Sequence, residues 1–197
     1  GERFRTFGEG QILGDFGGAG DIVWSALRAV GQAYTGRGQP TALTERFVEL
    51  CGAEDALRLI EGICRGQIHW PQARLAPVVF QVAAEGDEVA QEIIRYAGRE
   101  LGANAVAIAR RLAMLDEPFE LVLAGGLFRS KSDLLLGTLL ETVRASAPGA
   151  QPVLLHTAPV AGSVLLAMDA DGREATPEIQ ARLAEETHEC LERQRAE

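Results

Sequence analysis

The chain has 197 residues, of which 47% are hydrophobic and 24% are charged, and its formal net charge is −9. This length suits one domain with a full core, and the composition is that of an ordinary globular protein. The acidic excess argues against a nucleic-acid partner or an anionic membrane surface, because both require clustered cations. No apolar run is long enough for a membrane-spanning helix, and we expect no secretion signal.

The three cysteines are Cys51, Cys64 and Cys190, and none of them belongs to a Cys-x-x-Cys pair. The three histidines are scattered along the chain, so the sequence predicts neither a disulfide framework nor a metal site. Because free thiols are typical of a reducing compartment, we expect a cytoplasmic protein.

Hydrophobic periodicity predicts a series of helices that is interrupted late in the chain by two strands. Helices are predicted at residues 21–34, 41–49, 53–64, 75–84, 88–114, 131–145, 162–168 and 176–195, and strands at residues 119–124 and 153–156. The order strand, helix, strand, helix after residue 118 implies parallel pairing with a right-handed crossover. The predicted fold class is therefore α/β.

Local patterns add detail to the helices. Thr41 and Asp87 are predicted N-caps of the helices that follow them. Gly98 and Gly102 lie one turn apart in the longest helix and would let another element approach closely. Small and apolar residues cover more than one stripe of that helix, so we expect most of it to be buried, as well as the short helix 162–168. The charged final helix is expected to be solvated, with partner binding as the alternative.

A glycine-rich loop, Gln11–Gly20, leads into the first predicted helix and contains one acid, Asp15. Glycines leave room for a ligand to approach the backbone, and the first turn of a helix offers unpaired N–H groups. This combination suits an anionic or hydroxyl-rich small molecule, with the Asp15 carboxylate as a hydrogen-bond acceptor. A plain chain reversal is the alternative, and the residues alone leave both open.

A second glycine pair, Gly125-Gly126, follows the predicted strand 119–124. Parallel α/β units bind ligands at the carboxyl ends of their strands. Two glycines at such an end would let a flat ring or a phosphate lie against bare backbone. A tight turn from strand to helix explains the pair equally well.

These glycine motifs belong to a longer pattern of stretches in a fixed order. The stretches include Leu13-Gly14-Asp15-Phe16-Gly17-Gly18-Ala19-Gly20, Ala83-Ala84-Glu85-Gly86-Asp87-Glu88-Val89-Ala90, Leu123-Ala124-Gly125-Gly126-Leu127 and Pro159-Val160-Ala161-Gly162-Ser163. Together they resemble the BadF/BadG/BcrA/BcrD ATPase family, and within it the N-acetylglucosamine kinases. The resemblance covers about residues 8 to 170.

The resemblance implies a ribonuclease-H-like domain of the actin-like ATPase superfamily, with a short, mainly parallel sheet and many helices. Residues 1–175 would form the carboxyl-terminal domain of a sugar-kinase-type ATPase, and residues 176–197 a final packing helix. The family's amino-terminal domain, with its Asp-Gly-Gly-x-Thr phosphate loop and catalytic aspartate, has no counterpart in this chain. We therefore predict no catalytic residue here and no ATP turnover by this chain alone.

The same resemblance implies ligands and their sites. ATP and Mg²⁺ would act in the full-length protein, together with a small sugar substrate whose hydroxyl group is phosphorylated. The implied sugar-binding residues are Gly8, Glu9, Gly10 and Asp15, and the implied adenine- or ribose-binding residues are Gly125, Gly126 and Leu127. Asp15 would accept hydrogen bonds from the sugar hydroxyls.

Two other functions remain open at this stage. One is an ATPase that activates a dehydratase; such activators hold an iron–sulfur cluster between two subunits, and the cysteines here match no such arrangement. The other is a sensor or scaffold without chemistry, because Glu9, Phe16 and Gly18 replace the tryptophan, acid and serine that the family usually carries. The sequence leaves a homodimer open as well.

Overall fold

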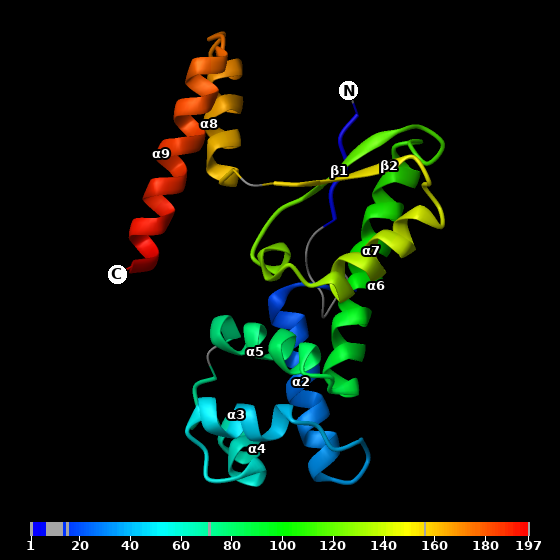
Figure 1. Ribbon diagram of the computed structural model, residues 1–197, viewed down its shortest axis with the longest axis vertical. Coiled ribbons are helices and arrows are strands. Elements are labelled where there is room, and N and C mark those ends of the chain that lie inside the picture. Colours follow the sequence, from blue (N-terminus) through cyan, green and yellow to red (C-terminus); the bar gives the residue numbers. More distant parts are fainter. Residues whose placement is uncertain (1, 7–13, 15, 71, 156, 197) are drawn as a thin grey trace. The chain divides into compact units, whose positions relative to one another are not determined.

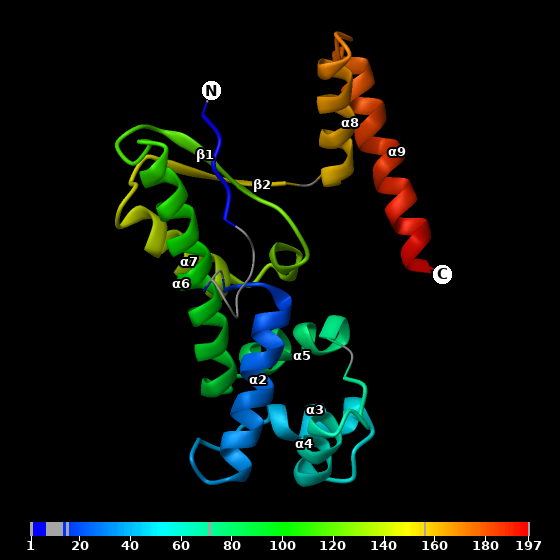
Figure 2. The same cartoon turned by 180° about the vertical axis from the view of Figure 1, so that it is seen from behind.

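The computed structural model describes residues 2–6, 14, 16–70, 72–155 and 157–196. The chain divides into two compact units, shown from opposite sides in Figures 1 and 2. Unit 1 comprises Gly1–Leu121 and Gly125–Pro152, and unit 2 comprises Val122–Ala124 and Val153–Glu197.

Unit 1 is built from helices, and their apolar faces form its core. The helices are α2 (Ala19–Tyr34), α3 (Leu43–Cys51), α4 (Ala56–Cys64), α5 (Gln72–Ala84), α6 (Glu88–Arg111) and α7 (Asp133–Arg144), with a short 3-10 helix, η1 (Leu127–Ser130), before α7. Helix α2 packs against α5 and α6, and α6 packs against α7 (Figure 1). The predicted helices of this unit are therefore present, although their bounds shift by a few residues.

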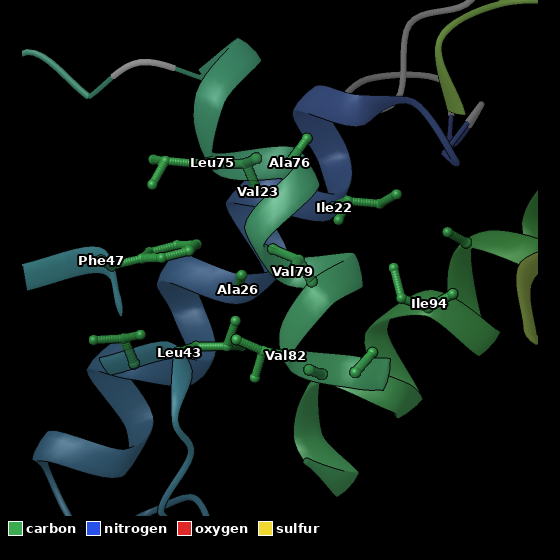
Figure 3. Packing of buried hydrophobic residues seen from close by; sticks show 14 of the residues in the cluster. Ile22, Val23, Ala26, Leu43, Phe47, Leu75, Ala76, Val79, Val82 and Ile94 are labelled. Carbon is green, nitrogen blue, oxygen red and sulfur yellow. The ribbon is translucent and has the colours of Figure 1, made fainter. Parts of the chain in front are cut away.

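The centre of the core lies where α2, α3 and α5 meet. Figure 3 shows Val23 of α2, Phe47 of α3 and Val79 of α5 gathered there, and all three are fully buried. Each buried side chain of this size stabilises the fold by about 1.5–3 kcal/mol relative to an exposed one. Helix α2 buries one apolar face, because Ile22, Val23, Ala26 and Val30 recur at helical spacing.

One carboxylate, that of Asp87, joins the starts of two helices. It accepts a hydrogen bond from the backbone N–H of Ala90 (2.8 Å), which confirms Asp87 as the N-cap of α6. It also accepts from the Ala42 N–H (2.8 Å) and from the Thr41 hydroxyl (3.0 Å). Ala42, the residue before α3, has helical angles, and the buried Thr41 hydroxyl accepts from the Leu43 N–H (3.2 Å). Thr41 therefore caps the start of α3, as predicted, while its hydroxyl also donates to Asp87.

Helices α6 and α7 cross closely at two glycines, as predicted. A Cβ atom on Gly98 would lie 2.8 Å from the Leu135 carbonyl oxygen, and one on Gly102 would lie 2.7 Å from Thr142 Cβ. The prediction that most of α6 is buried is wrong. The helix buries one stripe, because α5, α2 and α7 pack on that side: Ala90, Ile94, Ala97, Gly98, Gly102, Val106 and Ala109.

The sheet has two parallel strands, β1 (Phe119–Leu123) and β2 (Ala150–Leu154), in the described part of the chain. The Leu155 N–H continues the pairing by donating to the Leu123 carbonyl oxygen (2.9 Å). The first strand lies where it was predicted, but the second begins three residues before residue 153. Pro152 lies inside it, which is compatible with a strand that has a neighbour on one side only.

Unit 2 contains two helices, α8 (Pro159–Ala170) and α9 (Pro177–Ala196), which lie side by side (Figure 2). Helix α8 begins three residues before the predicted residue 162, because a proline in the first turn needs no N–H partner. Of α8 only Ala161 is buried, so the expected burial of this helix is wrong. The final helix is confirmed, with the Thr176 hydroxyl accepting from the Ile179 N–H (3.5 Å).

None of the described helices is both long enough and apolar enough to cross a bilayer.

Candidate functional site

The glycine loop before α2 is described only in part. The predicted sugar-binding residues Gly8, Glu9, Gly10 and Asp15 lie outside the described residues. Their role therefore stays a prediction. The structure does describe Gly14 and the segment 16–18, which lead directly into α2.

Two backbone N–H groups just before the first residue of α2 are already paired. The Asp21 carboxylate accepts hydrogen bonds from the backbone N–H groups of Gly17 (3.2 Å) and Gly18 (3.0 Å). A carboxylate at this position also interacts favourably with the positive end of the helix dipole. Of the two ligand classes predicted for this loop, an anion is thereby disfavoured, because Asp21 supplies the negative charge itself. A hydroxyl-rich ligand remains compatible.

The loop is held against α6 by close packing. A Cβ atom on Gly17, whose φ is +121°, would lie 2.6 Å from Leu101 Cγ and 3.3 Å from the Ala97 carbonyl oxygen. The Asn104 side-chain amide donates to the Phe16 carbonyl oxygen (3.5 Å). Gly17 is thus required both for its left-handed φ and for lack of space.

The second glycine pair forms an open turn after β1. Gly125 has a φ of +110°, and no heavy atom of the described residues lies within 4 Å of the position where its Cβ would be. Gly126 adopts helical angles and is the N-cap of η1. A Cβ on Gly126 would meet only the Arg129 guanidinium, at 3.4 Å. Within the described residues, the backbone at this turn is therefore accessible to a flat ligand, and the nucleotide-binding role of Gly125, Gly126 and Leu127 stays a prediction.

The residues after the glycines anchor the turn and give it positive charge. Leu127 and Phe128 are half-buried and pack against the core of unit 1. Arg129 and Lys131 are exposed, and Lys131 has a φ of +52°, in the left-handed region that favours glycine. These two cations were not predicted as part of the site, although both lie within five residues of Gly126 in the sequence.

Metal-binding and thiol chemistry find little support within the described residues. No group of three or more His, Cys, Asp or Glu side chains there could hold a metal ion. Cys51 and Cys64 are free thiols. Burial raises the pKa of the Cys51 thiol, which makes it a weaker nucleophile at neutral pH than an exposed cysteine.

Comparison with known proteins decides which family this glycine pattern represents. The sequence matches the BadF/BadG/BcrA/BcrD ATPase family over residues 1–167. The chain belongs to this ATPase family. The family has an actin-like ATPase fold, and its name implies the use of ATP.

Two relatives of this BadF-type chain have named activities. One is the N-acetylmuramic acid/N-acetylglucosamine kinase of Clostridium acetobutylicum, which is 31% identical over 135 residues, or 66% of this chain and 43% of the kinase. The other is the N-acetyl-D-glucosamine kinase of Dictyostelium discoideum, which is 30% identical over 171 residues, or 84% of this chain and 52% of the kinase. The chain thus spans about half the length of the curated relatives it matches.

Proposed function

We propose that this chain is the nucleotide- and substrate-binding half of an ATP-dependent sugar kinase, whose full-length form transfers a phosphoryl group to a sugar hydroxyl. Both named relatives are kinases of N-acetylated amino sugars, which favours a kinase over an activating ATPase. The observation that carries the proposal is the open Gly125-Gly126 turn at the end of β1, in a chain of an ATPase family.

The turn has the properties that a nucleotide needs. Bare backbone at Gly125 and Gly126 lets an adenine or ribose ring approach within van der Waals distance. Arg129 and Lys131 are exposed cations beside it, and cations of this kind form strong hydrogen bonds with phosphate oxygens. Leu127, packed against the core, holds the turn in place rather than offering its whole side chain to the ligand.

The sugar would lie at the glycine loop. Because Asp21 already neutralises the start of α2, the loop favours a neutral, hydroxylated ligand. Asp15 is proposed as the acceptor for the sugar hydroxyls, and Gly8, Glu9 and Gly10 as its neighbours in the site. The sugar itself is proposed only as a class, since Glu9 and Phe16 replace residues that the kinases of this family usually carry.

Magnesium enters the proposal only as part of the Mg²⁺–ATP complex. The acidic side chains of the described residues form no cluster that fits the ion, so these residues offer it no set of ligands. Within the proposed reaction, the residues of this chain bind and orient the two substrates.

The proposal can be tested by titrating the isotopically labelled chain with ATP and ADP while its backbone amide resonances are recorded. We expect saturable shifts centred on Gly125, Gly126 and Leu127. In the Gly126→Leu variant a side chain covers the bare backbone, so the affinity for nucleotide should fall by about tenfold or more.

A matched variant separates this effect from a general one. Gly137 in α7 also has open space around its Cβ position, so Gly137→Leu adds the same side chain away from the turn. It should leave nucleotide affinity unchanged. The absence of shifts at the turn, or equal weakening in both variants, would contradict the proposed nucleotide site.

A further inference from the structure

A groove lies between α2 and the first half of α6, both in unit 1, and the proposed function assigns it no role. Its volume is about 820 Å³, which is in the range of small-molecule binding sites. Phe16, next to Asp15 in the sequence, lies at its edge, and Trp24 and Tyr96 contribute from the two helices.

The aromatic rings in this groove are exposed and held in place. Trp24 is 42% exposed, and its ring packs edge-on against Trp70, with ring centroids 4.7 Å apart and an interplanar angle of 73°. Tyr96 is 39% exposed; its ring lies 6.2 Å from that of Phe16 and under the Arg99 guanidinium. Rings fixed in this way offer apolar surfaces for a ligand. Because they are already ordered, little side-chain conformational entropy is lost when a ligand binds.

The charges around the rings are largely compensated. Glu92 pairs with Arg99 (2.6 Å) and Arg95 (3.7 Å), and Asp21 accepts from the loop N–H groups. Asp21, Glu88 and Arg28 make none of the ion pairs found among the described residues, so the lining keeps two carboxylates against one cation. This small excess of negative charge disfavours an anionic ligand and is compatible with an uncharged one.

Uncharged donors and acceptors complete the groove. Ser25 and Gln32 project from α2, and Gln39 comes from the segment after it. A hydroxyl and two amides can both donate and accept hydrogen bonds, which is the pattern that sugar hydroxyls require. The faces of a pyranose ring carry weakly positive C–H groups, which pack well on the negative faces of tryptophan and tyrosine rings.

We propose that this groove binds a neutral glycan, with sugar rings stacked on Trp24 and Tyr96. The choice of a glycan rests in part on the proposed function, because Phe16 directly follows Asp15, the proposed sugar acceptor. The groove would then hold the sugar unit next to the one at the glycine loop, and the substrate class would include oligosaccharides.

Tryptophan fluorescence tests this proposal directly, because Trp24 and Trp70 are the only tryptophans in the chain. The chain, without nucleotide, is titrated with chitotetraose and with free N-acetylglucosamine. We expect a saturable change in emission, with the tetrasaccharide binding about tenfold or more tightly than the monosaccharide because it occupies more of the groove. No saturable change with millimolar chitotetraose would overturn the proposal.

Variants locate the binding. Tyr96→Ala removes one platform and keeps both reporters, and affinity for chitotetraose should fall by about tenfold or more. Tyr34→Ala removes an exposed tyrosine of α2 outside the groove and should leave affinity unchanged. Should Tyr96→Ala fail to fold, Gln39→Ala, at an exposed position, should weaken binding measurably without affecting the fold. Unchanged affinity in the folded groove variants would overturn the proposal.

Two outcomes separate this proposal from binding of a charged ligand in the groove and from the proposed nucleotide site. Displacement of the tetrasaccharide by inorganic pyrophosphate would overturn the assignment of a neutral ligand. Failure of ATP to shift the resonances at Gly125–Leu127 would refute the proposed nucleotide site, whereas the glycan titration is read at the tryptophans and stands or fails by itself.

Discussion

The two glycine-rich segments of this chain read alike in sequence and differ in structure. At the loop before α2, Gly17 is enclosed, with Leu101 and Ala97 of α6 occupying the space that a side chain would need. At the turn after β1, Gly125 also has a left-handed φ, but its Cβ position is open. Glycine is therefore needed at both sites for its backbone angles, and at the first one also for packing.

The residues that follow the two glycine segments also differ, because they carry opposite charges. The start of α2 is occupied by the Asp21 carboxylate, which pairs with the N–H groups of Gly17 and Gly18. The turn at Gly125 is followed by exposed cations, Arg129 and Lys131. A glycine motif thus becomes a candidate for an anionic ligand only where its own chain has not already supplied the anion.

The largest effect expected from this comparison is on stability. Gly17→Ala should lower the free energy of unfolding by about 2–4 kcal/mol, because the methyl group is both strained at φ +121° and crowded by Leu101. Gly125→Ala carries the strain without the crowding and should cost about 1–2 kcal/mol. Urea denaturation of both variants measures the difference, and equal costs would show that packing against α6 is unimportant.

A smaller effect on stability is expected at Asp21, whose carboxylate accepts hydrogen bonds from the glycine loop. Asp21→Ala should cost about 1 kcal/mol, because it leaves the Gly17 and Gly18 N–H groups without their partner. Asp21→Asn keeps an acceptor oxygen and should cost less. Thermal unfolding with and without phosphate extends the test: phosphate should stabilise the alanine variant more than the parent chain. If the parent gains as much, Asp21 does not exclude anions.

The smallest expected effect is an increase in the free energy of unfolding. Gly137 lies inside α7 with no atom near its Cβ position and without a positive φ. Gly137→Ala should therefore raise the free energy of unfolding by about 0.5–1 kcal/mol, as expected for alanine in place of glycine in a helix. A loss of stability in the same urea experiment would mean that this face of α7 is more closely packed than the structure indicates.

Much of the secondary structure followed from local signals. Asp87 and Thr176 cap their helices through hydrogen bonds that reach three residues along the chain; the Asp87 cap was predicted, and so was a helix from residue 176. Thr41 carried the same signal, and its hydroxyl accepts from the Leu43 N–H (3.2 Å). Its further contact with Asp87, 46 residues away, could not be predicted locally. The start of β2 was missed because Pro152 discourages a strand unless the strand lies at an edge.

The candidate site, too, could be predicted from the sequence only in part. The turn at Gly125-Gly126 was predicted from its place after a strand, with a ligand site and a plain chain turn as equal alternatives, and the structure describes its backbone as open. The aromatic groove was not predicted, because Phe16, Trp24 and Tyr96 are far apart in sequence and share no motif. Exposed aromatic side chains on an otherwise polar helix face were the available signal.

The sequence by itself determined the family, the succession of helices and strands, and the positions of the two glycine segments, since these depend on residues close together in the chain. Only the tertiary structure decided that Gly17 is enclosed and Gly125 open, and that Asp21 rather than a ligand pairs with the start of α2. The physical reason is that the space around a backbone atom is set by distant neighbours: Leu101, which crowds Gly17, lies 84 residues further along the chain.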